Sequence, residues 1–268
     1  MVDLCPLASP TKTTPETIIL ITKRLKSITI EGKLNLKDVT LVCADDVDTQ
    51  GSHDLLSYLN EKITFGNTFL FSSNNINHDV TLINKLSCLL DYDNFIHREL
   101  NDFISTSFCM IVQRDGFPIN LKKWNDDFLK YDYIGAPWTY LKLDSDLLVG
   151  NSGFSIRSKK FLDSHLSHYN SYECGGEDEF SCRSQKKHFE EQGCVYAPVS
   201  LASDFSVECM PYLDQVGFHG KETLRINIDS PSFGNFNHQI NQLPDKIKKI
   251  VLKEYGASKR RPKCPLIL

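Results

Sequence analysis

The feature that most constrains the fold is an alternation of strand and helix patterns in the first half of the chain. Thr106–Gln113 is the most strand-like stretch, because its apolar, β-branched composition suits a strand buried on both faces. Asp38–Asp46 is a second such run and ends in two carboxylates. Leucines at helical spacing over Ser52–Ile63 and a strand pattern over Asn67–Ser72 follow. The alternation predicts an α/β fold, a Rossmann-type mixed, mostly parallel sheet flanked by helices.

Shorter patterns continue through the second half of the chain. Leu148–Arg157 is expected to form a strand interrupted by glycines. Lys159–Tyr169 and Asp178–Gln192 are expected to form helices, the second ending at Gly193. Lys246–Tyr255 has the pattern of a last amphipathic helix.

The chain carries neither an internal repeat nor a linker long enough to separate two domains. We therefore expect one main domain over residues 36–222. Residues 1–35 would be an N-terminal extension, and residues 223–268 a C-terminal extension that contains the basic amphipathic helix.

Charge gives little support to a nucleic-acid partner. The 268 residues have a formal net charge of -4, whereas phosphate binding usually needs a positive excess. Basic residues gather only between Lys246 and Lys263. This stretch has two interpretations, a solvated helix face followed by a frayed terminus or a patch that binds phosphates.

Cysteine usage and the N-terminal sequence indicate a cytoplasmic protein. The nine cysteines are an odd number and form no C-x-x-C pair, which favours reduced thiols over disulfides or zinc. Residues 1–15 contain three prolines and no apolar core of a secretion signal. The apolar run Thr17–Ile21 is too short to span a bilayer, so we expect no transmembrane segment.

Acidic side chains follow two of the expected strands. Asp45 and Asp46 end the first strand, and Asp115 follows Thr106–Gln113 directly. Ligands of doubly wound sheets bind beyond the carboxyl ends of the strands, which makes these carboxylates candidate ligand-binding groups.

Asp115 and His219 could together hold a divalent metal. Asp115 precedes Gly116 in a tight turn, and Mg²⁺ or Mn²⁺ needs only one or two protein ligands when substrate phosphates supply the others. His219 lies between glycines in a distant segment, and Mn²⁺ accepts imidazole more readily than Mg²⁺ does. Taken singly, Asp115 could be a plain turn residue and His219 a structural histidine.

Two segments have small residues where a substrate could approach the backbone. Gly175 and Gly176 precede three consecutive carboxylates, of which Asp178 could also simply begin a helix. Val149–Ser155 alternates small residues within a strand, as a close-lying sugar would require. Trp138 offers an aromatic face to a sugar or base, with a place in the core as the alternative.

Taken in order, these segments resemble a poorly characterised family of glycosyltransferase-like proteins. The matching segments are Val112–Phe117, Trp124, Tyr131–Trp138, Val149–Arg157, Glu177-Asp178, Phe205–Glu208 and Phe218–Gly220. The same order of parts is similar to that of inverting galactosyl- and fringe-type transferases of the GT-A fold. The resemblance covers about residues 36–222.

This resemblance implies a GT-A-like fold and roles for individual residues. Asp115 would be the last aspartate of a D-x-D metal motif, whose first position is here Gln113, with only a neutral oxygen to offer. His219 would be the second ligand of Mn²⁺ or Mg²⁺, and Asp178 the general base. Glu177 or Glu179 would hold an acceptor hydroxyl.

The resemblance also implies binding subsites. The donor nucleotide would contact Asp45, Asp46, Gln113 and Arg114. The sugar or the acceptor would contact Trp138, Asn151, Ser152, Gly153, Gly175 and Gly176. Arg157 could bind a phosphate or an acidic sugar, or it could be a surface arginine.

The sequence therefore predicts a metal-dependent, inverting glycosyltransferase. It would move a sugar from a nucleoside-diphosphate sugar, with a UDP-sugar favoured, to the hydroxyl of a glycan or another acceptor. Two alternatives stay open. One is a glycan-binding protein of GT-A shape without turnover, and the other is a DNA-modifying sugar transferase that uses the basic C-terminal tail.

Overall fold

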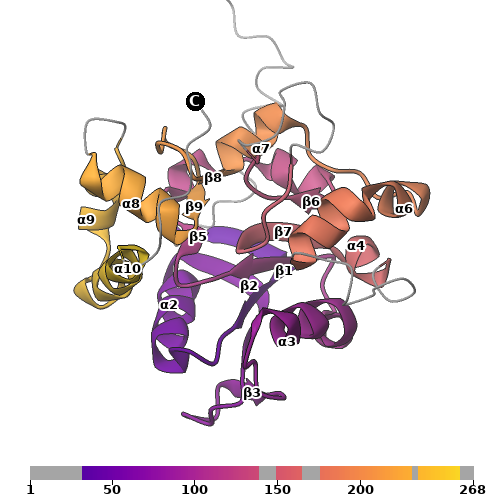
Figure 1. Ribbon diagram of the computed structural model, residues 1–268, viewed down its shortest axis with the longest axis horizontal. Coiled ribbons are helices and arrows are strands. Elements are labelled where there is room, and N and C mark those ends of the chain that lie inside the picture. Colours follow the sequence, from indigo (N-terminus) through magenta and orange to yellow (C-terminus); the bar gives the residue numbers. More distant parts are fainter. Residues whose placement is uncertain (1–31, 139–148, 165–175, 231–234, 260–268) are drawn as a thin grey trace, which may run out of the picture.

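A computed structural model of the chain describes residues 32–138, 149–164, 176–230 and 235–259. Its centre is a six-stranded sheet in the order β3-β2-β1-β4-β7-β6 (Figure 1). The strands are β1 (Leu34–Ala44), β2 (Ile63–Ser72), β3 (Val80–Leu82), β4 (Phe108–Val112), β6 (Tyr133–Ile134) and β7 (Phe154–Ser158). β3, β2, β1 and β4 pair in parallel, whereas β7 pairs antiparallel with both β4 and β6. The predicted mixed, mostly parallel sheet is confirmed.

A small second sheet lies beside the large one. Its strands are β5 (Gly116–Pro118), β8 (Ser206–Glu208) and β9 (Gly217–His219), in the order β5-β9-β8. Because β9 is the middle strand, it brings residues near position 219 beside both the turn after β4 and the end of β8.

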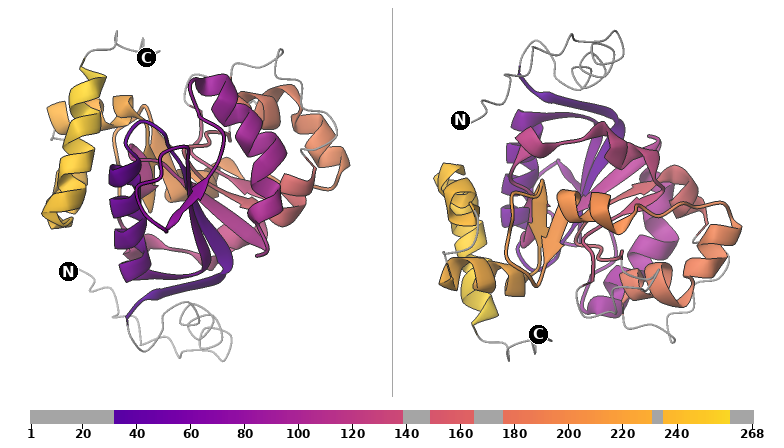
Figure 2. Two further views of the ribbon diagram at one scale, coloured as in Figure 1. Left: turned by 90° about the horizontal axis from the view of Figure 1, so that it is seen from below. Right: turned by 90° about the horizontal axis from the view of Figure 1, so that it is seen from above.

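Helices cover both faces of the large sheet. The α-helices are α2 (Thr49–Lys62), α3 (Leu89–Asn94), α4 (Lys159–Asp163), α5 (Glu177–Glu179), α6 (Lys186–Glu191), α7 (Val199–Phe205), α8 (Lys221–Asp229), α9 (Phe236–Gln242) and α10 (Asp245–Ser258). The 3₁₀-helical turns are η3 (Leu100–Phe103), η4 (Leu121–Lys123) and η5 (Asp126–Lys130), and the π-helical turns are η2 (Phe95–Glu99) and η6 (Phe180–Ser184). Figure 2 shows α2 and α10 on one side of the sheet and α3 on the other.

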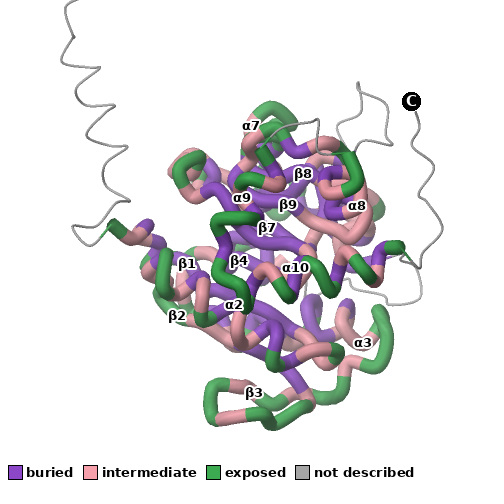
Figure 3. Tube along the Cα trace, turned by 90° about the vertical axis from the view of Figure 1, so that its left-hand side faces the viewer, coloured by how far each residue is buried: buried purple, intermediate pink, exposed green. Residues whose placement is uncertain are grey.

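The central strands are buried on both faces, as their composition predicts. Leu41 of β1 and Met110 of β4 face the core cluster that includes the α2 leucines. Val42 and Ile111, their neighbours along the chain, face the cluster on the α3 side, which includes Phe95. Side chains of a strand alternate between faces, so a strand with helices on both sides must be apolar throughout. The buried sheet is visible in Figure 3.

Two expected elements differ from the structure. The strand expected at Leu148–Arg157 begins only at Phe154, because Asn151 has a positive φ of 67° that ends regular extended geometry. The helix expected at Asp178–Gln192 is three short pieces, α5, η6 and α6, although it does end before Gly193, whose φ is 81°. Most of the predicted helix after Asp163 lies outside the described residues.

The C-terminal helix α10 packs on α2 and α8. Its side chains Ile247, Ile250 and Val251 are buried and belong to the same cluster as the α2 leucines. None of the helices in the four described ranges has the length and apolar character to cross a membrane.

Candidate functional site

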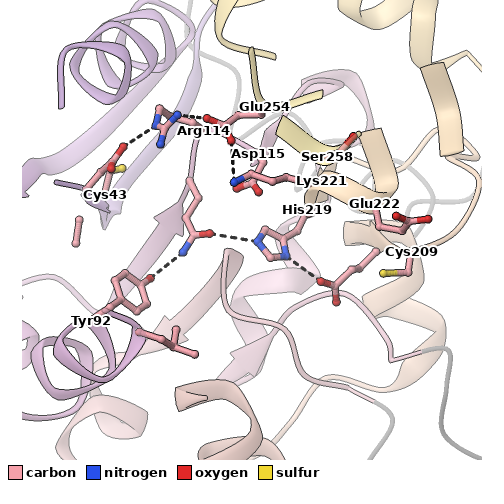
Figure 4. A pocket seen from close by; sticks show the side chains of 16 residues that line it. Cys43, Tyr92, Arg114, Asp115, Cys209, His219, Lys221, Glu222, Glu254 and Ser258 are labelled. Atoms are coloured by element: carbon pink, nitrogen blue, oxygen red, sulfur yellow. Dashed lines mark hydrogen bonds and ion pairs between the residues drawn. The ribbon is translucent and has the colours of Figure 1, made fainter. Parts of the chain in front are cut away.

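A cavity of about 590 Å³ opens at the carboxyl ends of β1 and β4. Asp45 lines it from the end of β1, and Gln113, Arg114 and Asp115 line it from the turn after β4. This is the edge at which ligands of open α/β sheets bind. The wall opposite comes from β8, β9, α8 and α10 (Figure 4).

His219 is held at the centre of this wall by three strands. Residue 219 on β9 pairs with Gly116 of β5 on one side and with Glu208 of β8 on the other. Its Nδ1 lies 3.1 Å from Oε1 of Glu208, and its Nε2 lies 3.2 Å from Oε1 of Gln113. The amide nitrogen of Gln113 donates in turn to the hydroxyl of Tyr92 at 3.2 Å. Both ring nitrogens thus face acceptors.

The surroundings of His219 favour its charged form. Burial alone would lower its pKa, but the hydrogen bond and the charge of Glu208 outweigh this, and the charges of Asp115 and Asp178 add to the effect. The pKa of His219 is raised from 6.5 to about 9. At neutral pH the ring is therefore an imidazolium that donates to Glu208 and Gln113.

Asp115 and His219 are brought together as the sequence predicts. The carbonyl oxygen of Asp115 accepts from the backbone N–H of Gly220 at 2.7 Å, next to the Gly116–His219 pair. Both side chains line the cavity.

Asp178 lies near this pair without lining the same cavity. It is half-buried at the start of α5, and the N–H of Glu179 donates to its carboxylate at 2.8 Å. Burial, followed by the charges of Glu177 and Glu208, raises the pKa of Asp178 to about 6. The charge of His219 acts in the opposite direction, so the two groups are within electrostatic range.

Glu177 has a different place from the one expected. Its side chain is 2% exposed and both oxygens are bonded to Arg157, at 2.7 and 2.9 Å. Arg157 is itself 0% exposed, so it is neither a surface arginine nor available to a phosphate. A bidentate pair of this kind uses both carboxylate oxygens, and Glu177 is corrected from a ligand-binding to a structural residue.

The glycine-rich segment before β7 makes room for protein side chains. A Cβ at Gly153 would lie 2.0 Å from Nε2 of His219, and one at Gly150 would lie 2.2 Å from the Trp138 ring. Trp138 is 4% exposed and part of the core, so the core alternative is the one observed. Asn151 is also buried, and its side-chain amide lies 2.7 Å from Nδ1 of His219; beside an imidazolium, the amide oxygen, which has no other partner among the described residues, is the atom that can face the ring. These residues pack against His219 and the core and are themselves buried. They were predicted to contact a sugar, and their burial gives them a structural role instead.

The remaining predicted sugar or acceptor residues are only partly described. Ser152 is half-buried, and its hydroxyl bonds to the Glu177 carboxylate and helps to lower the pKa of that group. Gly176 is buried and precedes α5 directly. Gly175 lies outside the described residues.

The two aspartates after β1 have separate roles. Asp45 lines the cavity and accepts from Nε of Arg114 at 2.6 Å. Asp46 instead accepts from the Ser72 hydroxyl at 2.5 Å and from the Leu86 N–H at 2.6 Å, bonds that lower its pKa against the effect of burial. Asp46 holds the loops after the strands together, and the prediction that it contacts a nucleotide is replaced by this structural role.

Several further cavity residues were not given a role from the sequence. Among them are Tyr92, Glu208, Lys221 and Glu254. No local pattern marked Tyr92 or Glu254 as a site residue. Glu208 ends one of the matching segments, and Lys221 follows His219 by two residues, but neither position indicated a contact with the cavity.

The cavity carries more acidic than basic groups. Its lining has five carboxylates against three basic side chains, namely Asp45, Asp115, Glu208, Glu222 and Glu254 against Arg114, His219 and Lys221. An anionic ligand would enter such a cavity at lower electrostatic cost together with a divalent cation.

Three of the lining residues carry atoms that could ligate a cation brought by a substrate. Within the described ranges, no three His, Cys, Asp or Glu side chains are arranged to hold a metal ion. Asp115, His219 and the amide oxygen of Gln113 nevertheless meet at one edge of the cavity. One or two such ligands suffice for Mg²⁺ or Mn²⁺ when phosphate oxygens complete the shell.

Two lysines of the basic C-terminal helix pair with acidic residues in α2 or at its N-terminal cap. Lys246 lies 2.5 Å from Asp54, and Lys253 lies 2.6 Å from Asp48. These lysines bind the helix to its own domain, while the predicted basic residues beyond Lys259 lie outside the described ones.

Comparison with known proteins gives one match. Residues 80–219 match a protein family whose description reads "Protein of unknown function (DUF5672)". No curated protein and no solved structure matches the chain. The matched stretch runs from β3 to β9 and contains Gln113, Asp115, Asp178 and His219. Because it covers more than half of the sequence, the chain belongs to the DUF5672 family.

Proposed function

We propose that this protein is an inverting glycosyltransferase with a GT-A-like fold. It moves a sugar from a nucleoside-diphosphate sugar to a hydroxyl of a glycan or another acceptor. The observation that carries the proposal is the meeting of Asp115 and His219 in one cavity at the carboxyl ends of β1 and β4. Asp178, close enough to shift the pKa of His219, supports it further.

The size of the cavity suits a nucleotide-sugar donor. Ligand sites of small molecules and cofactors commonly enclose about 300–1,000 Å³, and this one has about 590 Å³. Asp45 at one end could accept from ribose or base hydroxyl and N–H groups, as carboxylates at this edge of a sheet do. Gln113 and Arg114 would border the donor from the turn after β4.

A divalent cation would be held by Asp115 and His219, with Gln113 adding a neutral oxygen. When bound, Mn²⁺ or Mg²⁺ supplies Lewis-acid stabilisation of the negative charge that develops on the leaving diphosphate. His219 must give up a proton to become a ligand. Glu208, which accepts from Nδ1, then keeps the ring oriented with Nε2 toward the cavity.

Asp178 is the general base of the proposed reaction. With a pKa of about 6 it is ionised at pH 7 and can accept the proton of an acceptor hydroxyl. Attack from the face opposite the leaving diphosphate inverts the configuration of the anomeric carbon. The buried Arg157–Glu177 pair, next to Asp178 in the chain, fixes the start of α5 and thereby the position of the base.

Release of nucleoside diphosphate tests the proposal. The protein is incubated with a panel of nucleotide sugars and Mn²⁺, because an active transferase releases the diphosphate even by slow hydrolysis. We expect turnover with at least one sugar and a loss of about 10²-fold or more in Asp178→Asn. Glu179→Gln is the matched control, since Glu179 is the next carboxylate and pairs with Arg183 on the surface.

The alternatives give different results in the same assay. A glycan-binding protein without turnover, which the neutral Gln113 favours, would release no diphosphate in any condition. A DNA-modifying transferase would require a free basic patch, and three lysines of α10 are paired: Lys246 with Asp54, Lys248 with Asp245 and Lys253 with Asp48. A DNA affinity that falls steeply with salt would overturn our preference for a glycan or other small acceptor.

A further inference from the structure

The C-terminal helix supplies one side chain to the cavity that contacts two of its basic groups. Glu254 of α10 lines the cavity although it is only 5% exposed. One carboxylate oxygen bonds to Nη1 of Arg114, and the other lies 3.1 Å from Nζ of Lys221. Figure 4 shows the Glu254 carboxylate between these two side chains.

The two basic groups differ in their pairing within the protein and in their exposure to the cavity. Arg114 donates through Nε to Asp45 and through Nη1 to Glu254, with Asp48 at 3.9 Å, and its side chain is 10% exposed. The Lys221 side chain is 26% exposed, and Glu254 is the one ion-pair partner of its ammonium among the described residues. An ammonium has three N–H donors, so its pair with Glu254 leaves Lys221 with donors for a ligand. Arg114 also keeps N–H donors, but its side chain is less exposed than that of Lys221.

Glu254 is fixed in place by the packing of its helix. Ile247, Ile250 and Val251 on α10 are buried against the main core. Lys246 and Lys253 add ion pairs to α2 on either side. Because α10 is packed in this way, the Glu254 carboxylate stays in place and can orient the basic groups that it contacts.

We propose that Lys221 binds the diphosphate of the donor and that Glu254 is the residue that positions it. Glu254 holds the ammonium at the cavity wall, two residues from His219, with its free N–H groups toward the ligand. The inference rests on the proposed function, because it takes the anionic ligand to be a diphosphate. It adds a phosphate-binding residue beyond the predicted metal ligands and assigns the C-terminal helix to the donor site.

The first test is binding of inorganic pyrophosphate with Mg²⁺, measured by calorimetry on the full chain. Pyrophosphate has the two linked phosphates of the donor without its base or sugar, so its binding does not depend on which nucleotide sugar the protein uses. We expect Lys221→Ala to weaken binding about tenfold, as loss of one charge-assisted hydrogen bond does. Lys221→Gln, which retains most of the side-chain stem, repeats the test if the alanine variant does not fold. No binding by the unaltered protein, or equal binding by the variants, would overturn the proposal.

A double-mutant cycle tests the positioning role of Glu254. If Glu254 holds Lys221 in place, Lys221→Ala has a clearly smaller effect in a Glu254→Ala background than in the unaltered protein. If Glu254 instead competes with the ligand for Lys221, the effect is larger there, and that result or an unchanged effect rejects positioning. Lys246→Ala is the matched control, because it removes an α10 ion pair that lies away from the cavity. Its pyrophosphate affinity should be unchanged.

The two proposals fail in different ways. If pyrophosphate binds and depends on Lys221 and Glu254, but no nucleotide sugar is turned over, glycosyl transfer is rejected while the anion site stands. If nucleotide sugars are turned over and the Lys221 variants bind pyrophosphate normally, the proposed function stands and this inference is rejected.

Discussion

Two arginine–glutamate pairs in this molecule show how burial decides the role of a charge. Arg157 and Glu177 are 0% and 2% exposed and bond to each other through both oxygens. Arg114 and Glu254 also bond to each other, but at the wall of a cavity, where Glu254 has a second partner in Lys221. The first pair is buried and its charges are already bonded to each other, so it binds no ligand and acts by holding α5 in place. The second leaves an ammonium with unused donors beside a space of ligand size.

Breaking the closed pair should have the largest effect on stability. Arg157→Met leaves the Glu177 carboxylate buried without its partner, and we expect the free energy of unfolding to fall by about 3–5 kcal/mol. Denaturant titration measures this. The double variant Arg157→Met with Glu177→Leu should recover much of the loss, because it removes both charges. A double variant as unstable as the single one would mean that the pair is not the source of the effect.

Asp93 should make the stability of the same region depend on pH. Burial and then the Glu177 charge raise its pKa from 3.8 to about 7. Because the folded state favours the protonated Asp93 carboxyl, its contribution to the free energy of unfolding is fully present below pH 4 and is lost as pH rises to about 7. The expected change is a few kcal/mol. Asp93→Asn should lack this contribution, so the difference in unfolding free energy between the two proteins should vary with pH between 4 and 7. A constant difference would contradict the assignment.

Near the cavity, a pH dependence should also appear in the rate. Asp178, with a pKa of about 6, must be ionised to accept a proton. We expect the turnover of nucleotide sugar to rise about tenfold per pH unit below 6 and to level off above it. A pH–rate profile that stays flat between pH 5 and 7 in the presence of saturating donor would argue against Asp178 as the base.

The smallest effect on stability is expected from the exposed ion pairs of α10, the helix that carries Glu254. The Lys246 side chain is 61% exposed in its pair with Asp54, so Lys246→Ala should change the unfolding free energy by no more than about 0.5 kcal/mol. The same denaturant titration measures it. A loss of several kcal/mol would show that α10 depends on this ion pair more than on its apolar face.

The sequence allowed prediction of the elements whose patterns are local. The buried strands β1 and β4, helix α2 and helix α10 lie where apolar runs and leucine spacing place them. The continuously apolar composition of β1 and β4 also predicted that both faces of the sheet are covered. After Gly176 the helical pattern of the sequence predicted one continuous helix. The structure has the π-helical turn η6 within that stretch, which divides it into three short pieces.

The site could be predicted only where a short motif marked it. Asp115 and His219 both line the cavity, as expected: Asp115 follows a predicted strand, and His219 was singled out by its flanking glycines and by the resemblance. Glu254 was missed because its contact with Arg114 spans 140 residues and has no sequence period. Glu177 and Trp138 were assigned to ligands because a residue type does not tell whether its side chain is buried.

The pairing of β1 has a consequence for how the family should be delimited. β1 is hydrogen-bonded to β2 on one side and to β4 on the other, yet it lies before the matched residues 80–219. A protein cut to the matched stretch would expose an open edge of β4 and lose the middle of the sheet. The matched stretch is therefore smaller than the unit that forms the sheet.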